Sequence, residues 1–81
     1  SNNSSPRLTV DASVVAKRME VHRHRHEHSH SSSTWYYATF EVESGDRVEL
    51  GVSGSQYGLL VEGDQGKLTF QGTRYLGFER A

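Results

Sequence analysis

The sequence predicts an all-β domain with one short helix, folded as a small five-stranded β-barrel of the OB-like type. Five segments alternate apolar and polar residues with the two-residue period of a strand, and a further segment, between the third and fourth, breaks this alternation. Three strands, a short helix and two strands is the element order of an OB barrel. An SH3-like barrel, in which a helical turn precedes the last strand, is the alternative.

The first expected strand covers residues 7–21 and carries a bend. Met19 and Val21 have the opposite parity to the apolar residues before them, so a regular strand would turn them outward. A β-bulge near Lys17 and Arg18 would return both to the inner face and would bend the strand. The earlier apolar residues that we expect on the core side are Leu8, Val10, Ala12, Val14 and Ala16.

The second and third expected strands form a hairpin around the sequence SGD. Residues that oppose each other across a hairpin point to the same side, so pairing Val42 with Val48 requires an odd number of loop residues. A three-residue loop of residues 44–46 meets this condition and places Glu43 opposite Arg47. The residues expected on the core side of the two strands are Tyr36, Ala38, Phe40 and Val42, then Val48, Leu50 and Val52.

A short helix and two strands complete the expected barrel. Ser55 can cap a helix of one or two turns that Gly63 ends. The last two strands follow at residues 66–71 and 74–80. A two-residue turn would send the apolar residues of the last strand away from those of the strand before it, so we expect a three-residue loop of residues 72–74. The apolar residues of these elements are Tyr57, Leu59, Leu60, Leu68, Phe70, Leu76 and Phe78.

Composition limits what such a domain can do. The chain has 81 residues and no cysteine, so a small core must hold it together without disulfides or cysteine-bound zinc. Nine basic and ten acidic residues give a formal net charge of −1, which disfavours broad attraction to nucleic acid or anionic lipid. No apolar run approaches the ~20 residues that span a bilayer. We expect residues 1–7 to be a flexible lead-in and residues 8–81 to form one domain.

All five histidines lie in one tract, at every second position. We expect residues 22–34 to be a His-rich loop between the first two strands, because the tract has no apolar stripe and ends in a run of serines. In an extended segment, alternate imidazoles share a face about 6.5 Å apart, and two neighbours could bind one zinc ion. Adventitious binding of Zn²⁺, Ni²⁺ or Cu²⁺ is a further interpretation. The candidate metal ligands are His22, His24, His26, His28 and His30.

Exposed aromatic residues are the second candidate for a site. Trp35, Tyr37 and Tyr75 have the parity of the outward face, where their rings could meet a partner. Three glutamates share that face and would repel phosphates, so we do not expect binding to nucleic acid.

Signatures of catalysis are missing from the sequence. It has no serine on a nucleophile elbow and no phosphate-binding glycine loop. Asp46 and Asp64 occupy turn sequences, where aspartate is an ordinary turn former. We therefore expect a non-enzymatic module that carries no resident cofactor.

Two stretches of the sequence resemble one small bacterial family: SPRLTVDASVVAKR and YYATFEVESGDRVELGVSGSQYGLLVEGDQGKLTFQGTRYLGFER. The part from VSGSQYG onward is the more specific, and the lead-in and the histidine tract lie outside the resemblance. The family is domain of unknown function 2500. Its members typically have a transmembrane helix before the β-domain, so the resemblance implies a domain tethered to the outer side of the cytoplasmic membrane. It implies no activity and no catalytic residues.

These observations predict a non-enzymatic, membrane-anchored, extracytoplasmic binding module with a protein partner, and they are compatible with a homo-oligomer. The alternative is a metal-binding or metal-sensing module that uses the His-rich loop. Sub-micromolar, stoichiometric zinc binding that is lost when the histidines are replaced distinguishes this alternative.

Overall fold

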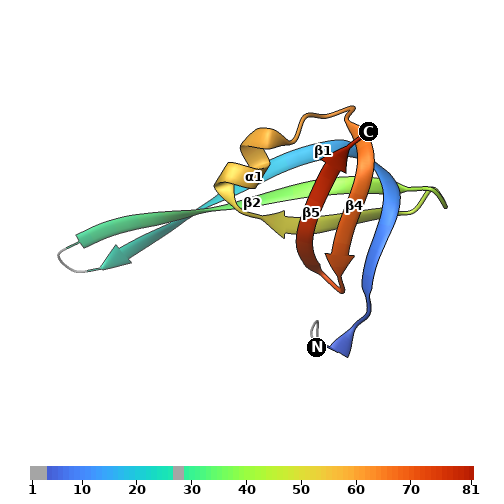
Figure 1. Cartoon of the computed structure of the whole chain (residues 1–81). Helices are drawn as coiled ribbons and strands as arrows, with labels where there is room; N and C mark the ends of the chain where they lie inside the picture. The colour runs from blue at the N-terminus through green and yellow to red at the C-terminus, as the bar shows by residue number, and fades with distance from the viewer. Residues whose placement is uncertain (1–3, 27–28) are drawn as a thin grey trace.

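Five strands and one helix follow one another in the predicted order (Figure 1). A computed structural model describes residues 4–26 and 29–81 of the chain. Residues 1–3 of the predicted lead-in therefore lie outside the described part. The elements are β1 (Arg7–His26), β2 (Ser29–Val42), β3 (Arg47–Val52), α1 (Gly54–Leu59), β4 (Gln65–Gln71) and β5 (Arg74–Arg80).

The strands close into a barrel in the order β1-β2-β3-β5-β4. β1 pairs antiparallel with both β2 and β4, which brings the two ends of the sheet together. β3 and β5 pair in parallel, at Gly51 and Arg74. This strand order, with the helix between β3 and β4, is that of an OB-like barrel, so the predicted fold class is confirmed over the SH3-like alternative. In the part of the chain that the structure describes, no helix is long and apolar enough to cross a membrane.

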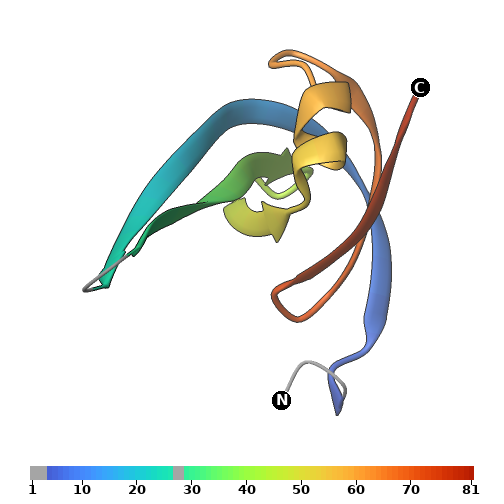
Figure 2. The ribbon, with the colours of Figure 1, turned by 90° about the vertical axis from the view of Figure 1, so that its left-hand side faces the viewer.

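β1 is shared between the barrel and a projection, and it bends between the two (Figure 2). The bulge that we predicted near Lys17 lies earlier, where the register with β2 shifts between Val14 and Ala16. The shift turns Ala16 outward and gives Met19 and Val21 the parity of the inner face, as predicted. Both residues are nevertheless more than half exposed, at 52% and 53%, because Met19 lies level with the last residue of β3 and Val21 lies beyond it.

The hairpin between β2 and β3 has a three-residue loop, one residue earlier than predicted. The N–H of Val42 donates to the carbonyl of Asp46 at 2.9 Å, and the N–H of Gly45 donates to the carbonyl of Val42 at 2.8 Å. Gly45 has a φ of 91°, the left-handed conformation that the last residue of such a loop adopts. The predicted pairing was therefore wrong by two residues, and Glu41, not Glu43, opposes Arg47.

The hairpin between β4 and β5 also differs from the prediction. Gln71 opposes Arg74, so the loop has two residues, and Gly72 begins it with a φ of 61°. The register then shifts at Phe70, which leaves Leu76 without an opposing residue. This bulge brings apolar residues of β5 onto the same face as those of β4, which is the effect that we expected a longer loop to have. Phe70 consequently opposes Tyr75, and Leu68 opposes Phe78.

The short helix α1 begins and ends earlier than the sequence suggested. Ser53, not Ser55, is the N-cap, and it forms a capping box with Gln56. Leu60 is the C-cap, and Gly63 lies beyond the helix with a φ of 98°. The helix therefore delivers Leu60 into the core directly after its last turn, at 4% exposure.

The core lies entirely within the barrel. Its buried residues come from all strands except β5 and from the residue after α1, and β5 adds half-buried rings. The expected core faces of β2, β3 and β4 are confirmed, whereas Leu8 and Ala16 are exposed. The buried core residues are Ala12, Val14, Ala38, Phe40, Leu50, Leu60 and Leu68.

The described residues of the predicted loop, 22–26 and 29–34, are strand and not loop, because β1 and β2 stay paired there. The ladder continues from Glu20 opposite Trp35 to His26 opposite Ser29. Figure 1 shows the result as a two-stranded hairpin that projects from the barrel, beyond the end of β3. We call residues 20–26 and 29–35 the arm. Both faces of the arm carry polar side chains, so the apolar alternation that identifies a strand in the sequence is missing there.

Trimming the arm should leave the barrel folded, because none of the described side chains of the arm belongs to the buried core. In the trimmed variant, Asn-Gly replaces residues 23–32 and joins the opposed residues His22 and Ser33. We expect its free energy of unfolding to lie within about 1 kcal/mol of the wild-type value. Urea denaturation followed by circular dichroism measures this. A trimmed chain that is unfolded in buffer would contradict the separation of core and arm.

Candidate interaction surface

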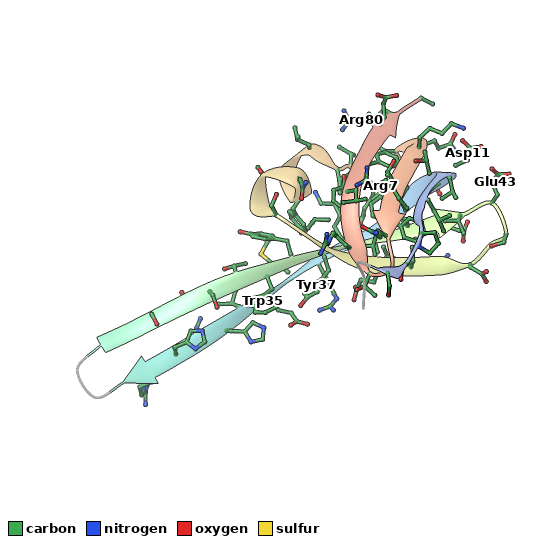
Figure 3. All side chains as sticks on the ribbon, turned by 60° about the horizontal axis from the view of Figure 1, so that its bottom comes forward. Arg7, Asp11, Trp35, Tyr37, Glu43 and Arg80 are labelled. Atoms are coloured by element: carbon green, nitrogen blue, oxygen red, sulfur yellow. The ribbon has the colours of Figure 1, made fainter. Side chains whose placement is uncertain are left out.

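The face of β1, β2 and β3 that points away from the core carries a continuous row of polar and aromatic side chains, which we call the outer face. Because opposed residues in a sheet share a face, the register identifies its members. Figure 3 shows Trp35 and Tyr37 at the point where the arm leaves the barrel. From here on the name outer face refers to the part of it formed by Arg18, Glu20, His22, His24, Ser33, Trp35, Tyr37 and Glu49.

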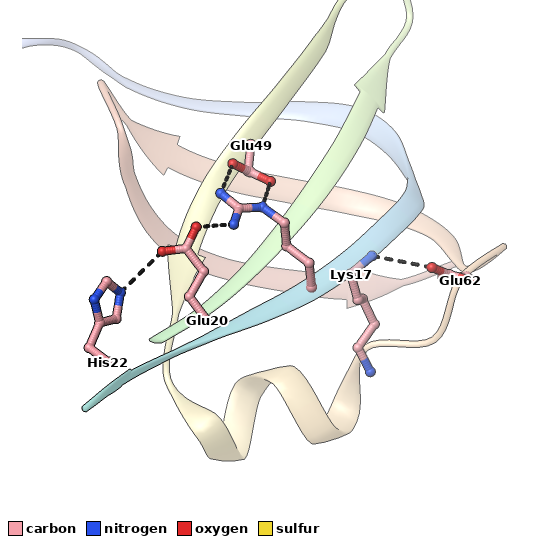
Figure 4. A network of polar contacts seen from close by, with 6 residues as sticks. Lys17, Glu20, His22, Glu49 and Glu62 are labelled. Carbon is pink, nitrogen blue, oxygen red and sulfur yellow. Dashed lines mark hydrogen bonds and ion pairs between the residues drawn. The ribbon is translucent and has the colours of Figure 1, made fainter. Parts of the chain in front are cut away.

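Arg18 is the centre of the outer face, where it is bonded to both Glu20 and Glu49, which are labelled in Figure 4. Its Nε and Nη2 atoms donate to the two carboxylate oxygens of Glu49, each at 2.8 Å, in a bidentate pair. Its Nη1 atom donates to Glu20, and the guanidinium lies 4.2 Å from the centre of the Tyr37 ring. One side chain thus joins three strands and holds the Tyr37 ring.

The row continues from Arg18 onto the arm. Glu20 Oε1 lies 3.2 Å from Nε2 of His22, and the His22 and Trp35 rings are 5.5 Å apart. His24 Nε2 lies 3.1 Å from the Ser33 hydroxyl oxygen. The side chains on this part of the arm are therefore held by contacts that begin at the barrel wall.

Charge on the outer face is set mainly by Arg18. The hydrogen bonds from Arg18 lower the pKa of both Glu49 and Glu20, and a contact with His22 lowers the pKa of Glu20 further. The same carboxylates raise the pKa of Arg18. Both glutamates are therefore ionised near neutral pH and held in ion pairs.

Trp35 is the large apolar group that this row presents to solvent, with 55% of its surface exposed. A hollow of about 380 Å³ lies beside it, lined among others by Thr34, Tyr37 and Gly51. Gly51 has open space where a side chain would stand, so this position adds no bulk to the wall of the hollow. An exposed indole beside a hollow and hydrogen-bonding groups is the usual composition of a protein-binding hot spot.

The inner face of the same sheet contacts α1 just before the arm begins. The Tyr36 and Tyr57 rings are 5.0 Å apart, and the Lys17 ammonium lies 4.1 Å from the centre of the Tyr57 ring. Lys17 Nζ also donates to the carbonyl of Leu60 at 2.7 Å. These contacts fix the arm at its base, and sequence reasoning missed them because Lys17 was expected at a bulge.

The histidines that we predicted as metal ligands are only partly described. His22 and His24 share the outer face, at neighbouring positions of the same parity. His26 and His30 lie at the paired ends of β1 and β2, while their side chains and the whole of His28 lie outside the described residues. Within the part that the structure describes, no three potential ligands gather as a metal site would require. Metal binding by the complete tract therefore stays a prediction.

Tyr75 does not belong to the outer face, contrary to our expectation. Its ring stacks on the buried Phe40 ring at 5.9 Å between centres, and burial raises the pKa of its hydroxyl group. The bulge at Leu76 is the cause, because it reverses the parity that the sequence suggested. Trp35 and Tyr37 are thus the two predicted aromatic residues that share a surface.

A second hollow, of about 660 Å³, lies at the opposite side of the barrel from the arm and was not predicted. Figure 3 shows Asp11, Glu43 and Arg80 around it. Lys67 Nζ lies 2.6 Å from Asp11, and Lys67 and then Glu43 lower the pKa of Asp11. Arg80 is held by Asp64, at 2.8 Å, and lowers its pKa. The main charges here are satisfied by pairing within the chain.

Comparison with known proteins places the chain among proteins of unknown function. The family model "Protein of unknown function (DUF2500)" matches residues 1–79. A crystal structure from Proteus penneri ATCC 35198 has a similar fold, with a TM-score of 0.79 and 22% identity over 94% of this chain and 96% of that one. An X-ray structure of a DUF2500 protein from Klebsiella pneumoniae has a TM-score of 0.73 and 28% identity over 91% of this chain and 96% of that one. No curated protein matches this chain.

Removing Arg18 should make stability depend less on pH in the acid range. Arg18 lowers the pKa values of Glu49 and Glu20 in the folded state. Their contribution to the free energy of unfolding is therefore present above the unfolded-state pKa and is lost as the pH falls through the folded-state pKa. We expect Arg18→Gln to be less stable than the wild type at pH 7 and to approach it at pH 3. Urea denaturation across this range measures both chains.

The matched control is Arg74→Gln, which removes the same charge from an exposed position without a described ion pair. It should keep the pH dependence of the wild type. An Arg18→Gln chain whose deficit grows on acidification would refute the proposed role of Arg18.

Proposed function

The chain belongs to the DUF2500 family of proteins of unknown function, and we propose that it is a non-enzymatic binding module that holds a protein partner on its outer face. The observation that carries this proposal is the exposed indole of Trp35, which is placed by contacts with its neighbours on a strand segment that contributes nothing to the core. Trp35 is the only tryptophan of the chain.

The arm supports this proposal because it adds little to the stability of the fold. Ordering a strand residue costs backbone entropy, which burial normally offsets. Among its described side chains the arm contributes none to the buried core, and it holds them by exposed polar contacts. We infer that a paired projection of this kind presents a surface to a partner and does not mainly stabilise the domain.

The charges of the outer face favour a protein over a polyanion. Glu20 and Glu49 flank the aromatic pair and are ionised, so phosphates would be repelled. Arg18 and Tyr37 are stacked and partly exposed, and tyrosine, tryptophan and arginine are the residues that dominate protein interfaces.

The same charges support a non-enzymatic role. A general acid or base works best when its pKa lies near the working pH. On the outer face, Arg18 lowers the pKa of the carboxyl groups of Glu20 and Glu49, away from that range. Such groups act as fixed charges in recognition.

We also propose that the module is anchored in the membrane and faces the extracytoplasmic side. The support is the resemblance to a family whose members typically have a helix before the β-domain. Cells that express the natural gene product should retain it in the membrane fraction, and protease added to spheroplasts should remove the β-domain. A product recovered in the cytosol would refute the anchor and leave the outer-face proposal standing.

Photo-crosslinking in such cells tests the outer face directly. We expect p-benzoylphenylalanine at Trp35 or Tyr37 to form an adduct of one discrete mass, because a bound partner would cover both rings. The matched control is the same residue at Leu59, an apolar side chain on α1 that is 71% exposed and lies outside the outer face. Immunoblotting of the tagged chain measures the adducts.

The proposal fails if neither outer-face position forms an adduct, or if Leu59 forms the same adduct as strongly. Trimming residues 23–32 should preserve the adduct, because the outer-face residues that surround Trp35 remain in the trimmed chain.

A further inference from the structure

One edge of the arm is an open strand edge. β3 pairs with β2 only as far as Val52, which opposes Tyr36. Beyond this point the chain leaves the sheet through Ser53 into α1, while β2 continues to Ser29. The edge of residues 29–35 that faces away from β1 therefore has no neighbouring strand among the described residues.

The backbone groups on this edge follow from the alternation along β2. The N–H and C=O groups of a strand residue point to one side, and successive residues alternate between the two sides. Val42 donates to Asp46 at the start of β3, so the even-numbered residues of β2 point towards the β3 side. Thr34 and Ser32 thus direct their backbone donors and acceptors to the open edge, and Thr34 also lines the hollow beside Trp35.

The two long edges of the arm differ in charge. The β1 half of the arm, residues 20–26, contains one glutamate, two arginines and three histidines, whereas residues 29–35 of β2 contain four serines, a threonine, a tryptophan and a single histidine. Charged side chains on an edge strand oppose pairing with another strand. The open edge of β2 has no side chain with a permanent charge, so it lacks this protection.

We propose that the open edge of β2 pairs with the same edge of a second copy of the chain, antiparallel about a twofold axis at Ser32. Ser32 is the centre of residues 29–35, and its backbone groups face the edge. A twofold axis there aligns the free segments of the two copies over their full length. The edge-facing residues then oppose one another, Ser32 with Ser32 and Thr34 with position 30 of the second copy. Each such pair exchanges two backbone hydrogen bonds.

The side chains in this register are compatible with close approach. Ser33 of each copy opposes Ser31 of the other, and Trp35 opposes position 29, at the edge of the hollow. The charged β1 strands form the outer edges of the resulting four-stranded ribbon, which protects it from further growth. A twofold interface of this kind is self-complementary and closes with two copies.

This inference goes beyond the proposed function. The pairing uses the backbone edge of β2, so the side chains of Tyr37 and Arg18 remain exposed, and an adduct from Trp35 that has the mass of two chains reports the pairing and not the proposed partner. The two can therefore fail separately. A monomeric chain that still forms the adduct from Trp35 would overturn the inference and leave the proposed function intact.

Sedimentation equilibrium from about 10 μM to 1 mM tests the pairing. The wild-type mass should rise with concentration towards that of two chains. Ser32→Lys and Ser32→Glu place like charges opposite each other at the axis, so each should remain at the mass of one chain. An equimolar mixture of the two variants should regain the mass of two chains, because opposite charges then meet.

Gln65→Lys is the control, since it adds the same charge at an exposed position of β4 outside the arm. It should associate as the wild type does, and the chain trimmed of residues 23–32 should not associate. A wild type that stays monomeric at 1 mM overturns the inference. So does a dimer that Ser32→Lys leaves unchanged, because the copies then meet elsewhere.

Discussion

The continuous antiparallel pairing of β1 with β2 is the interaction on which the rest of the structure depends. It begins inside the barrel, at Ala12 opposite Val42, and ends at His26 opposite Ser29, with a single shift of register at the Val14 bulge. Before the bulge, β1 also pairs with β4 and closes the barrel. After it, the same ladder leaves the core and becomes the arm. One pair of strands therefore both completes the fold and carries the candidate surface away from it.

The barrel and the arm are stabilised in different ways. Apolar burial around Phe40 and Leu68 stabilises the barrel, since both side chains are fully buried. The arm depends on backbone pairing and on exposed polar contacts, each of which contributes little in water. Arg18 matters chiefly because it orients Glu20, Tyr37 and Glu49 relative to one another. This division explains how a surface can be presented without weakening the core.

Much of the fold could be predicted from the sequence because apolar alternation reports burial. The core faces of β2, β3 and β4 follow that rule, and so does the element order. The rule fails where burial is absent, which is why the sequence predicts a loop where the arm is paired. It also fails where a bulge changes parity, which misplaced Tyr75 on the outside. Of the candidate surface, Trp35 and Tyr37 were predictable, whereas the pairing of Arg18 with Glu49 depends on a register that only the folded chain defines.

The central claim is that the described part of the histidine tract, residues 22–26 and 29–34, belongs to an ordered two-stranded arm and not to a loop. Nuclear Overhauser spectroscopy of the free chain in solution tests it most directly. The account predicts cross-strand contacts between backbone protons of residues 22–24 and residues 31–33, as strong as those between Lys17 and Ala38 at the arm's base. Random-coil shifts and no cross-strand contacts in the tract would contradict it, because Trp35 would then lie beside a loop and β2 would offer no edge.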